Sequence, residues 1–310
     1  MFSVVFPGQG SQMVRMGKEF FDKHDQVKKF FKDADDILGI SLTKIIFDGP
    51  KDQLDLTINT QPAIFLVSYS IFNVLKNEHN IDLSKAEYFA GHSLGEYSAL
   101  AAAGYLDFQN TIKLLRVRGD AMQNAVPNGE GGMVVALGSS IESIERILIE
   151  NQNNFKTQIA NDNSDGQIVL SGRNKDLDQL MSVLKKNNIK NLKLAVSAPF
   201  HCELMIKATE IMKKEIEKVE FKDAKIKLIS NVTANEILNK EELKKLLIKQ
   251  IESPVKWRES VLYMIENGVK KFIEIGPGKV LSGLIKRIDR SAKLISINDV
   301  DDLEKINLND

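Results

Sequence analysis

The sequence predicts an α/β protein with a mostly parallel central sheet and a smaller inserted domain. Three observations support this prediction. Short apolar runs alternate with helix-like segments over most of the chain, which is typical of sheets covered by helices on both faces. A glycine-rich segment, 127–132, is followed by about seventy residues in the order βαββαβ, the ferredoxin-like split motif. The 310 residues have room for one large domain with such an insert.

Before the insert, the predicted strands are apolar or aromatic runs that end at turn residues. Some predicted helices have apolar residues every three or four positions. Others begin at a cap residue, Asn59 or Asp107, and the first of these has a proline, Pro62, near its start. These rules place strands at 2–6 and 86–90, and helices at 18–38, 59–75, 94–103 and 108–125.

The insert and the segment after it follow the same rules. In the insert we predict strands at 133–137, 157–160, 167–171 and 192–196, and helices at 141–151 and 177–187. After the insert we predict strands at 225–230, 269–275 and 294–297, and helices at 241–251, 257–267 and 280–288. We therefore divide the chain into a large domain, 1–126 with 199–310, and a small domain, 127–198.

The composition excludes several classes of protein. Lysine plus arginine equals aspartate plus glutamate at 42 each, so no overall positive field favours nucleic acid and no acidic excess indicates disorder. The single cysteine, Cys202, excludes an intrachain disulfide and metal sites built on cysteine pairs. No signal peptide and no apolar run of about 18 residues is evident, so we expect a cytoplasmic protein without cofactor or metal.

The segment Gly91-His92-Ser93-Leu94-Gly95 lies between a predicted strand and a predicted helix. This arrangement is typical of a nucleophile elbow, in which small residues two positions either side of the serine leave room for a strained turn. Ser93 would stand at the amino end of the helix, where backbone N–H groups can stabilise negative charge. The alternative is an ordinary turn with a capping serine.

A serine nucleophile needs a base, and the chain has four histidines. His92 lies inside the turn and should point away from Ser93, while His24 and His79 have polar neighbours and are expected on the solvated surface. His201 remains, where the chain returns to the large domain. A structural histidine is the alternative. If the His201 pKa were the ordinary value near 6.5, activity would fall below about that pH.

Arg118 is the candidate for gripping a substrate carboxylate, because a guanidinium forms two parallel hydrogen bonds with one. Arg116, two positions away on the same predicted helix, must face elsewhere. From the sequence alone, a surface position is favoured for either arginine. Cys202 is predicted to be a small packed residue rather than a second nucleophile. No convincing acidic partner for His201 is found.

Six motifs in order resemble the malonyl-CoA:acyl carrier protein transacylases of type II fatty acid synthesis, over nearly the whole chain. They are Phe-Pro-Gly-Gln-Gly-Ser-Gln at 6–12, Gly-His-Ser-Leu-Gly-Glu-Tyr at 91–97, Arg-Gly at 118–119, Pro-Phe-His at 199–201, Gln250 with Ser-Pro-Val-Lys-Trp at 253–257, and Glu-Ile-Gly-Pro-Gly-Lys at 274–279. The resemblance implies a large α/β-hydrolase-like domain carrying a small ferredoxin-like one.

The resemblance also implies a role for each matching residue. Ser93 would be the nucleophile that becomes malonylated, His201 the general base and acid, and Arg118 the clamp on the malonyl carboxylate. Backbone N–H groups of Gln9 and Leu94 would form the oxyanion hole, and the Gln250 region would orient the His201 ring through a backbone carbonyl.

The implied substrates are malonyl-CoA and holo acyl carrier protein, with no nucleic acid or membrane partner, and we expect a monomer. Phe200 resembles the bulky residue of malonyl-selecting members. Seven basic residues would be available for the carrier protein or CoA phosphates, although a solvated surface is favoured for each: Lys185, Lys186, Lys190, Lys193, Lys286, Arg287 and Arg290.

Three asparagines, Asn161, Asn163 and Asn231, follow or end predicted strands facing the cleft. They could hydrogen-bond substrate, although turn formation is favoured. Two rival functions also remain at this stage. A serine esterase would use the same elbow without needing a buried Arg118, and a silent carrier-protein-binding module would not need Ser93.

Overall fold

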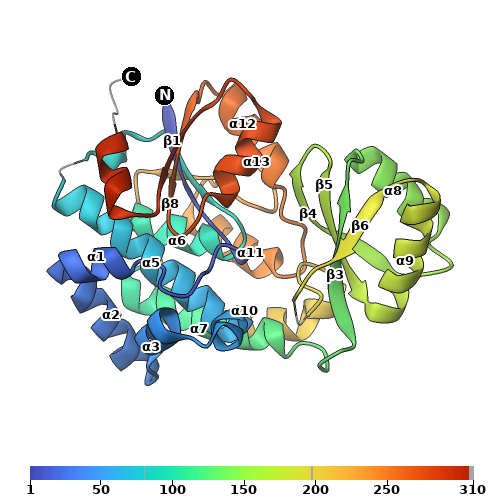
Figure 1. Ribbon diagram of the computed structural model, residues 1–310, viewed down its shortest axis with the longest axis horizontal. Helices are drawn as coiled ribbons and strands as arrows, with labels where there is room; N and C mark the ends of the chain where they lie inside the picture. Colours follow the sequence, from blue (N-terminus) through green and yellow to red (C-terminus); the bar gives the residue numbers. More distant parts are fainter. Residues whose placement is uncertain (80, 197, 307–310) are drawn as a thin grey trace.

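A parallel sheet forms the centre of the larger part of the computed structural model, which describes residues 1–79, 81–196 and 198–306 (Figure 1). In the described residues its strand order is β7-β2-β1-β8-β9, and every pair is parallel. The strands are β1 (Phe2–Phe6), β2 (Tyr88–Gly91), β7 (Lys227–Leu228), β8 (Lys271–Ile275) and β9 (Lys293–Ile297). All five residues of β1 are buried, because helices cover both faces of the sheet.

The helices of this part cover the sheet and extend below it. They are α1 (Lys18–Lys23), α2 (Asp25–Leu38), α3 (Leu42–Asp48), α4 (Lys51–Asp55), α5 (Thr57–Asn77), α6 (Leu94–Ala103), α7 (Phe108–Gln123), α10 (Ile206–Glu217), α11 (Lys240–Gln250), α12 (Trp257–Glu266) and α13 (Val280–Ile288), with 3-10 segments at Leu83–Lys85, Glu203–Met205 and Val300–Lys305. The bounds of α6 and α13 are as predicted. Helices α3, α4 and α10 were not predicted from the sequence.

The predicted helix 18–38 is wrong at its middle, because His24 has extended backbone angles and separates α1 from α2. The expected solvation of His24 is also wrong. Its side chain is only 11% exposed and its Nδ1 lies 2.6 Å from Oε2 of Glu78, beyond the end of α5. His79 is exposed, as expected.

Helix α5 begins two residues before the predicted start and holds Pro62 in its interior. Proline has no N–H, so the carbonyl of Ile58, four residues earlier, lacks its usual helical donor. The side chain of Arg116 on α7 donates to that carbonyl at 3.1 Å. This bond compensates for the proline and ties α5 to α7.

A second, antiparallel sheet lies beside the first (Figure 1). In the described residues its order is β4-β5-β3-β6, from β3 (Gly131–Leu137), β4 (Thr157–Ser164), β5 (Gln167–Arg173) and β6 (Lys190–Lys193). Helices α8 (Ile141–Glu150) and α9 (Asn174–Lys186) pack on one face through a separate apolar cluster that includes Ile144 and Leu180. This is the ferredoxin-like arrangement that the βαββαβ order predicts. The domain boundaries at 126/127 and 198/199 stay predictions.

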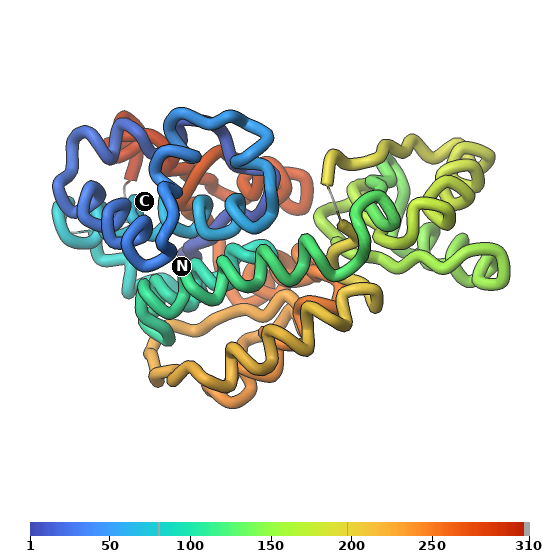
Figure 2. The backbone as a smooth tube through the Cα atoms, turned by 90° about the horizontal axis from the view of Figure 1, so that it is seen from below, coloured from blue at the N-terminus to red at the C-terminus, as the bar shows by residue number. Residues whose placement is uncertain are grey.

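The two sheets are connected by the chain itself and by main-chain hydrogen bonds. Helix α7, green in Figure 2, runs beneath the first sheet towards the second. The Val255 N–H donates to Ala160 O at 2.8 Å, and the Asp162 N–H donates to Val255 O at 3.0 Å. These bonds add residue 255 of the larger part to the edge of β4.

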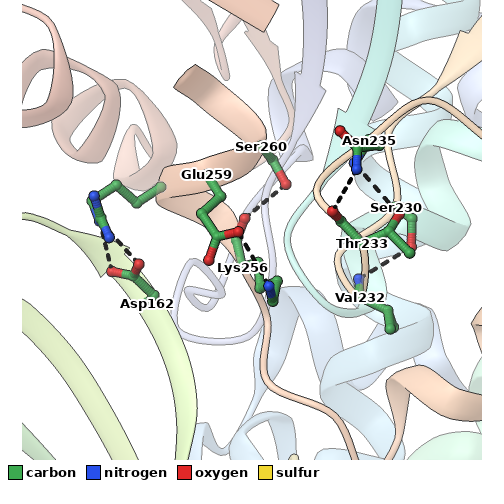
Figure 3. A network of polar contacts seen from close by, with 9 residues as sticks. Asp162, Ser230, Val232, Thr233, Asn235, Lys256, Glu259 and Ser260 are labelled. Atoms are coloured by element: carbon green, nitrogen blue, oxygen red, sulfur yellow. Dashed lines mark hydrogen bonds and ion pairs between the residues drawn. The ribbon is translucent and has the colours of Figure 1, made fainter. Parts of the chain in front are cut away.

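An ion pair reinforces this junction (Figure 3). Arg258 Nε, at the start of α12, lies 2.9 and 3.1 Å from the two carboxylate oxygens of Asp162 on β4. Burial raises the pKa of Asp162 to about 6 even though Arg258 acts to lower it. None of the described helices combines the length and apolar character needed to span a bilayer.

Candidate active site

The turn between β2 and α6 has the geometry of a nucleophile elbow. Ser93 has φ 54° and ψ −109°, a strained conformation for a residue with a side chain. A Cβ on Gly91 would lie 2.0 Å from the carbonyl carbon of Gly95, and a Cβ on Gly95 would lie 2.2 Å from the Phe6 carbonyl oxygen. Both positions therefore need glycine for β1, β2 and α6 to meet at this turn.

Ser93 and His201 form a hydrogen-bonded pair. Ser93 Oγ lies 2.8 Å from His201 Nε2, and His201 Nδ1 lies 2.9 Å from the backbone carbonyl oxygen of Gln250. A carbonyl can only accept, so Nδ1 carries the proton and Nε2 presents its lone pair to the serine. The ring is thus oriented by the main chain at Gln250, and no carboxylate of the described residues bonds to it.

His201 is neutral at physiological pH. It is 4% exposed, and burial, followed by the nearby positive charge of Arg118, lowers the pKa of His201 to about 3. The ordinary pKa near 6.5, on which the expected loss of activity below that pH depends, therefore does not apply to His201. A buried neutral imidazole is ready to accept the serine proton over the whole neutral range.

The Arg118 side chain is buried beside the serine and only 1% exposed, so the surface position that the sequence favours is wrong. Its Nη1 donates to Gln61 Oε1 at 2.7 Å, and its Nη2 donates to Ser93 Oγ at 3.1 Å and to Gln250 Oε1 at 2.8 Å. No carboxylate of the described residues forms an ion pair with Arg118, and burial lowers its pKa. A buried cation without an ion-pair partner is a site for an anion.

Helix packing explains this burial. Gly119, the next residue on α7, lies so close to α5 that a Cβ there would be 2.6 Å from the Thr57 carbonyl oxygen. The close approach leaves Arg118 directed at the elbow, while Arg116 contacts the Ile58 carbonyl of α5 instead. The different directions of Arg116 and Arg118 follow from their spacing of two on a helix.

The residues predicted for an oxyanion hole lie at the same cavity. Leu94 is the first residue of α6, so its N–H belongs to those at a helix start that have no intrahelical acceptor. Gln9 lies in the loop after β1, and its side chain donates to Thr57 Oγ1 at 3.2 Å. Both residues line a cavity of about 100 Å³ together with Ser93, Arg118 and His201.

A wider cleft continues from this cavity. Its volume is about 720 Å³, within the usual range for ligand clefts of about 300–1,000 Å³. Gln9, His92 and Asn161 line both spaces, and Lys51 and Arg287 line the wider one. The cleft runs between the two sheets and gives a long substrate a path to Ser93.

The three cleft asparagines have different surroundings. Asn231 braces the elbow: its Oδ1 accepts from the Ser93 N–H at 2.7 Å and its Nδ2 donates to Gly91 O at 2.7 Å. Asn163 Oδ1 lies 2.8 Å from Nε2 of His92, so the His92 ring contacts the small domain. Asn161 lines the cavity, and its buried Oδ1 has no partner among the described residues.

Two residues of this site were missed from the sequence. Gln61 holds Arg118, and Glu96 accepts from Gln250 Nε2 at 2.9 Å. The available signal is polarity where burial is expected: Gln61 stands in the long apolar helix, and Glu96 in a helix otherwise rich in alanine and leucine.

The remaining candidates form no hydrogen bond with the side chains of Ser93, His201 or Arg118 in the described residues. Cys202 is buried, its Sγ donates to the Pro199 carbonyl at 3.1 Å, and burial raises its pKa to about 11, consistent with a packed residue. Phe200 is 6% exposed and lines the small cavity. The seven basic residues named above are all exposed. Among the described residues, no group of three or more His, Cys, Asp or Glu side chains could hold a metal ion.

Comparisons with known proteins agree with this arrangement. The model of the acyl transferase domain family matches residues 3–305. A malonyl CoA-acyl carrier protein transacylase of Bacillus subtilis (strain 168) is 42% identical, covering 97% of this chain and 94% of its own.

Solved structures of related proteins superpose closely on this chain. The acyl-carrier-protein-S-malonyltransferase of Bartonella henselae superposes with a TM-score of 0.95 at 39% identity, covering 98% of this chain and 97% of its own. A malonyl-transacylase solved in complex with a type II PKS acyl-carrier protein superposes with a TM-score of 0.94 at 37% identity, covering 98% of each chain. The chain therefore belongs to the acyl transferase domain family and, within it, to the malonyl CoA-acyl carrier protein transacylases.

Proposed function

We propose that this protein transfers the malonyl group of malonyl-CoA to the phosphopantetheine thiol of an acyl carrier protein, through a malonyl ester on Ser93, and so supplies fatty acid chain elongation. One observation carries the proposal. Ser93 Oγ lies between the base nitrogen of His201, at 2.8 Å, and the buried guanidinium of Arg118, at 3.1 Å. A nucleophile beside an unpaired buried cation suits an acyl group that carries its own carboxylate.

In this proposal Arg118 selects and orients the substrate. The malonyl carboxylate pairs with the guanidinium and supplies the negative charge that the buried cation lacks. The thioester carbon, two bonds away, is thereby delivered to Ser93 in one geometry. The CoA or carrier-protein arm occupies the wider cleft, whose lining includes the cationic residues Lys51 and Arg287.

The chemistry follows from the protonation states. His201 Nε2 accepts the Ser93 proton as Oγ attacks the thioester carbon, and the backbone N–H groups of Gln9 and Leu94 stabilise the tetrahedral oxyanion. Collapse breaks the carbon–sulfur bond, and the imidazolium returns its proton to the CoA sulfur. The carrier-protein thiol then attacks the ester with the same base, which restores the serine and gives ping-pong kinetics.

Two other functions use parts of the same site. A serine esterase would use Ser93 and His201, but it has no need of a buried guanidinium at the nucleophile. A non-catalytic binding module would not need the strained elbow or the Ser93–His201 pair. The burial of Arg118 against Ser93 therefore favours the transferase over both.

Intact-mass measurement after mixing with malonyl-CoA tests the proposal. We expect a malonyl adduct on the wild type, no adduct on Ser93→Ala, and loss of the adduct to holo acyl carrier protein when that is added. The absence of an adduct on the wild type would contradict the malonyl-serine intermediate. An adduct that water removes, and that the carrier protein does not accept, would support the esterase instead.

A further inference from the structure

Beneath the nucleophile lies a buried carboxylate for which the proposed reaction has no direct use. Glu96 stands three residues after Ser93 on α6 and is only 1% exposed. Its Oε2 accepts from the Gln250 side-chain Nε2 at 2.9 Å and from the Asn231 N–H at 2.9 Å. Its Oε1 is buried without a partner in the described residues. A buried carboxylate with one unsatisfied oxygen is costly, so its presence here needs a reason.

Gln250 connects this carboxylate to the reacting groups. Its Oε1 accepts from Arg118 Nη2 at 2.8 Å, and its Nε2 donates both to Glu96 and, at 3.1 Å, to the Ser93 carbonyl oxygen. Its own backbone carbonyl holds His201. The side-chain amide of Gln250 is therefore placed between an obligatory donor, the guanidinium, and an obligatory acceptor, the Glu96 carboxylate.

Only one orientation of that amide satisfies both neighbours. If the amide flipped, its NH₂ group would face the guanidinium and its oxygen would face the carboxylate, so that donor would meet donor and acceptor would meet acceptor. An ionised acceptor at Glu96 makes the observed orientation strongly preferred, because charge-assisted hydrogen bonds are about twice as strong as neutral ones.

We propose that Glu96 is a positioning residue for malonyl transfer: it fixes the orientation of the Gln250 amide and thereby holds Arg118 where it receives the substrate carboxylate. The proposal rests on the proposed function in taking Arg118 as the carboxylate clamp. Asn231 connects Glu96 to the elbow in the same way. The backbone N–H of Asn231 donates to the Glu96 carboxylate, and the side-chain oxygen of Asn231 accepts from the Ser93 N–H.

The surroundings of Glu96 move the pH at which it ionises towards neutrality. The neighbours that face it are Arg118 from α7, Tyr97 from its own helix, and the uncharged Gln250 and Asn231. Burial raises the pKa of Glu96 to about 7, while the bonds from Asn231 and Gln250 and the charge of Arg118 act to lower it. As the pH falls through that value, the carboxylate gains a proton and its hold on Gln250 weakens.

The test compares Glu96→Gln with Glu274→Gln. The first variant keeps an oxygen acceptor and removes the charge. The second neutralises another buried glutamate with a raised pKa, which accepts from the N–H groups of Leu281 and Ser282 and does not touch Ser93, His201 or Arg118. Any effect of merely neutralising a buried carboxylate will therefore appear in both.

For malonyl-CoA we expect kcat/KM of Glu96→Gln to fall about tenfold above pH 7, mostly through KM, as for one weakened charge-assisted bond. Acylation by acetyl-CoA, which does not use the clamp, should change less than about threefold. The wild-type profile should decline below about pH 7, and that inflection should be absent in Glu96→Gln and retained in Glu274→Gln. Equal effects of the two variants, or an inflection that survives Glu96→Gln, would overturn the proposal.

Side-chain NMR of Gln250 and Arg118 supplies a readout without turnover. We expect the Gln250 amide and Arg118 guanidinium resonances to shift with pH near 7 in the wild type, and to be displaced and insensitive to pH in Glu96→Gln. Unchanged resonances would overturn the positioning role. A wild type that forms no malonyl adduct would overturn the proposed function alone, since the NMR comparison does not depend on it.

Discussion

Nη2 of Arg118 lies 3.1 Å from Oγ of Ser93, so the buried cation donates a hydrogen bond to the serine hydroxyl. Arg118→Ala should therefore cost about 2–5 kcal/mol of transition-state binding for malonyl-CoA, or a loss of about 30-fold or more in kcat/KM. Turnover of uncharged acyl thioesters should be retained or increase. Steady-state kinetics with malonyl-CoA and acetyl-CoA measure both.

The matched control is Arg116→Ala, on the same helix but bonded to the Ile58 carbonyl. This variant should keep the preference for malonyl-CoA even if it loses stability. Equal losses on the charged and uncharged substrates in Arg118→Ala would count against the carboxylate clamp.

His201 should remain neutral far below its usual titration range, because burial and Arg118 lower its pKa to about 3. Nitrogen NMR of the labelled imidazole should find the Nδ1–H tautomer from pH 8 to pH 5. An imidazolium spectrum at pH 6 would contradict this prediction. A decline in malonyl transfer near pH 7 is accordingly expected from Glu96 and not from the base.

Glu96 should make the fold less stable as the pH rises. Burial raises its folded-state pKa to about 7 from 4.5, so the folded protein binds this proton more tightly than the unfolded chain does. This difference in proton binding contributes about 3 kcal/mol to the free energy of unfolding below pH 4.5. The contribution is lost as the pH rises from 4.5 to about 7.

Urea unfolding of Glu96→Gln should therefore show a gain of that order over the wild type at pH 8 and little difference near pH 4.5. The exposed Glu145→Gln should change neither value beyond about 0.5 kcal/mol. A Glu96→Gln gain that is the same at both pH values would argue against ionisation as its source.

Gly119→Ala should separate the helices that place Arg118, because the new Cβ would lie 2.6 Å from the Thr57 carbonyl oxygen. We expect a loss of about 1–3 kcal/mol in unfolding free energy and a higher KM for malonyl-CoA. The control is Gly283→Ala on α13, where a Cβ meets nothing within 4 Å. That variant should gain about 0.5–1 kcal/mol, and a similar gain at Gly119 would refute the close-packing explanation.

Phe200 lines the small cavity and should limit the size of the acyl group. Phe200→Ala should raise kcat/KM for methylmalonyl-CoA relative to malonyl-CoA about tenfold, because removing the ring makes room for a methyl group worth about 1–3 kcal/mol. Competition between the two substrates, read by intact mass of the acyl-enzyme, measures the ratio. An unchanged ratio would assign the size limit to other lining residues.

The sequence predicts the elbow and its flanking elements well, because local rules act there. The glycines at 91 and 95, the buried strand and the helix over 94–103 are all signals within a few residues of Ser93. Helix α10 buries only Ala208, Met212 and Ile216, one residue per turn, and its other positions are mostly charged, so it resembles a solvated segment. Its burial against α7 and α11 results from tertiary packing, which the sequence pattern of the helix does not show.

The polar site shows the same division between local and distant signals. Residue type predicts His201 as the base by elimination, but the carbonyl that holds its ring belongs to the main chain of Gln250, which has no side-chain signature. Arg118 reads as a surface residue because the groups that cover it come from positions 61, 93 and 250. For the same reason, the partners of Glu96 become evident only when α6 and α11 are seen together.

The main-chain bonds between Val255 and β4 have a consequence for how acyl groups are sorted. They hold residue 255 of the larger part against β4 on either side of Asn161, which lines the cavity at Ser93, so we expect this part of the wall to move little when substrate binds. Selection between acyl groups should then depend on how well each group fits the existing cavity. Single substitutions of lining side chains such as Phe200 should therefore be enough to change the acyl preference.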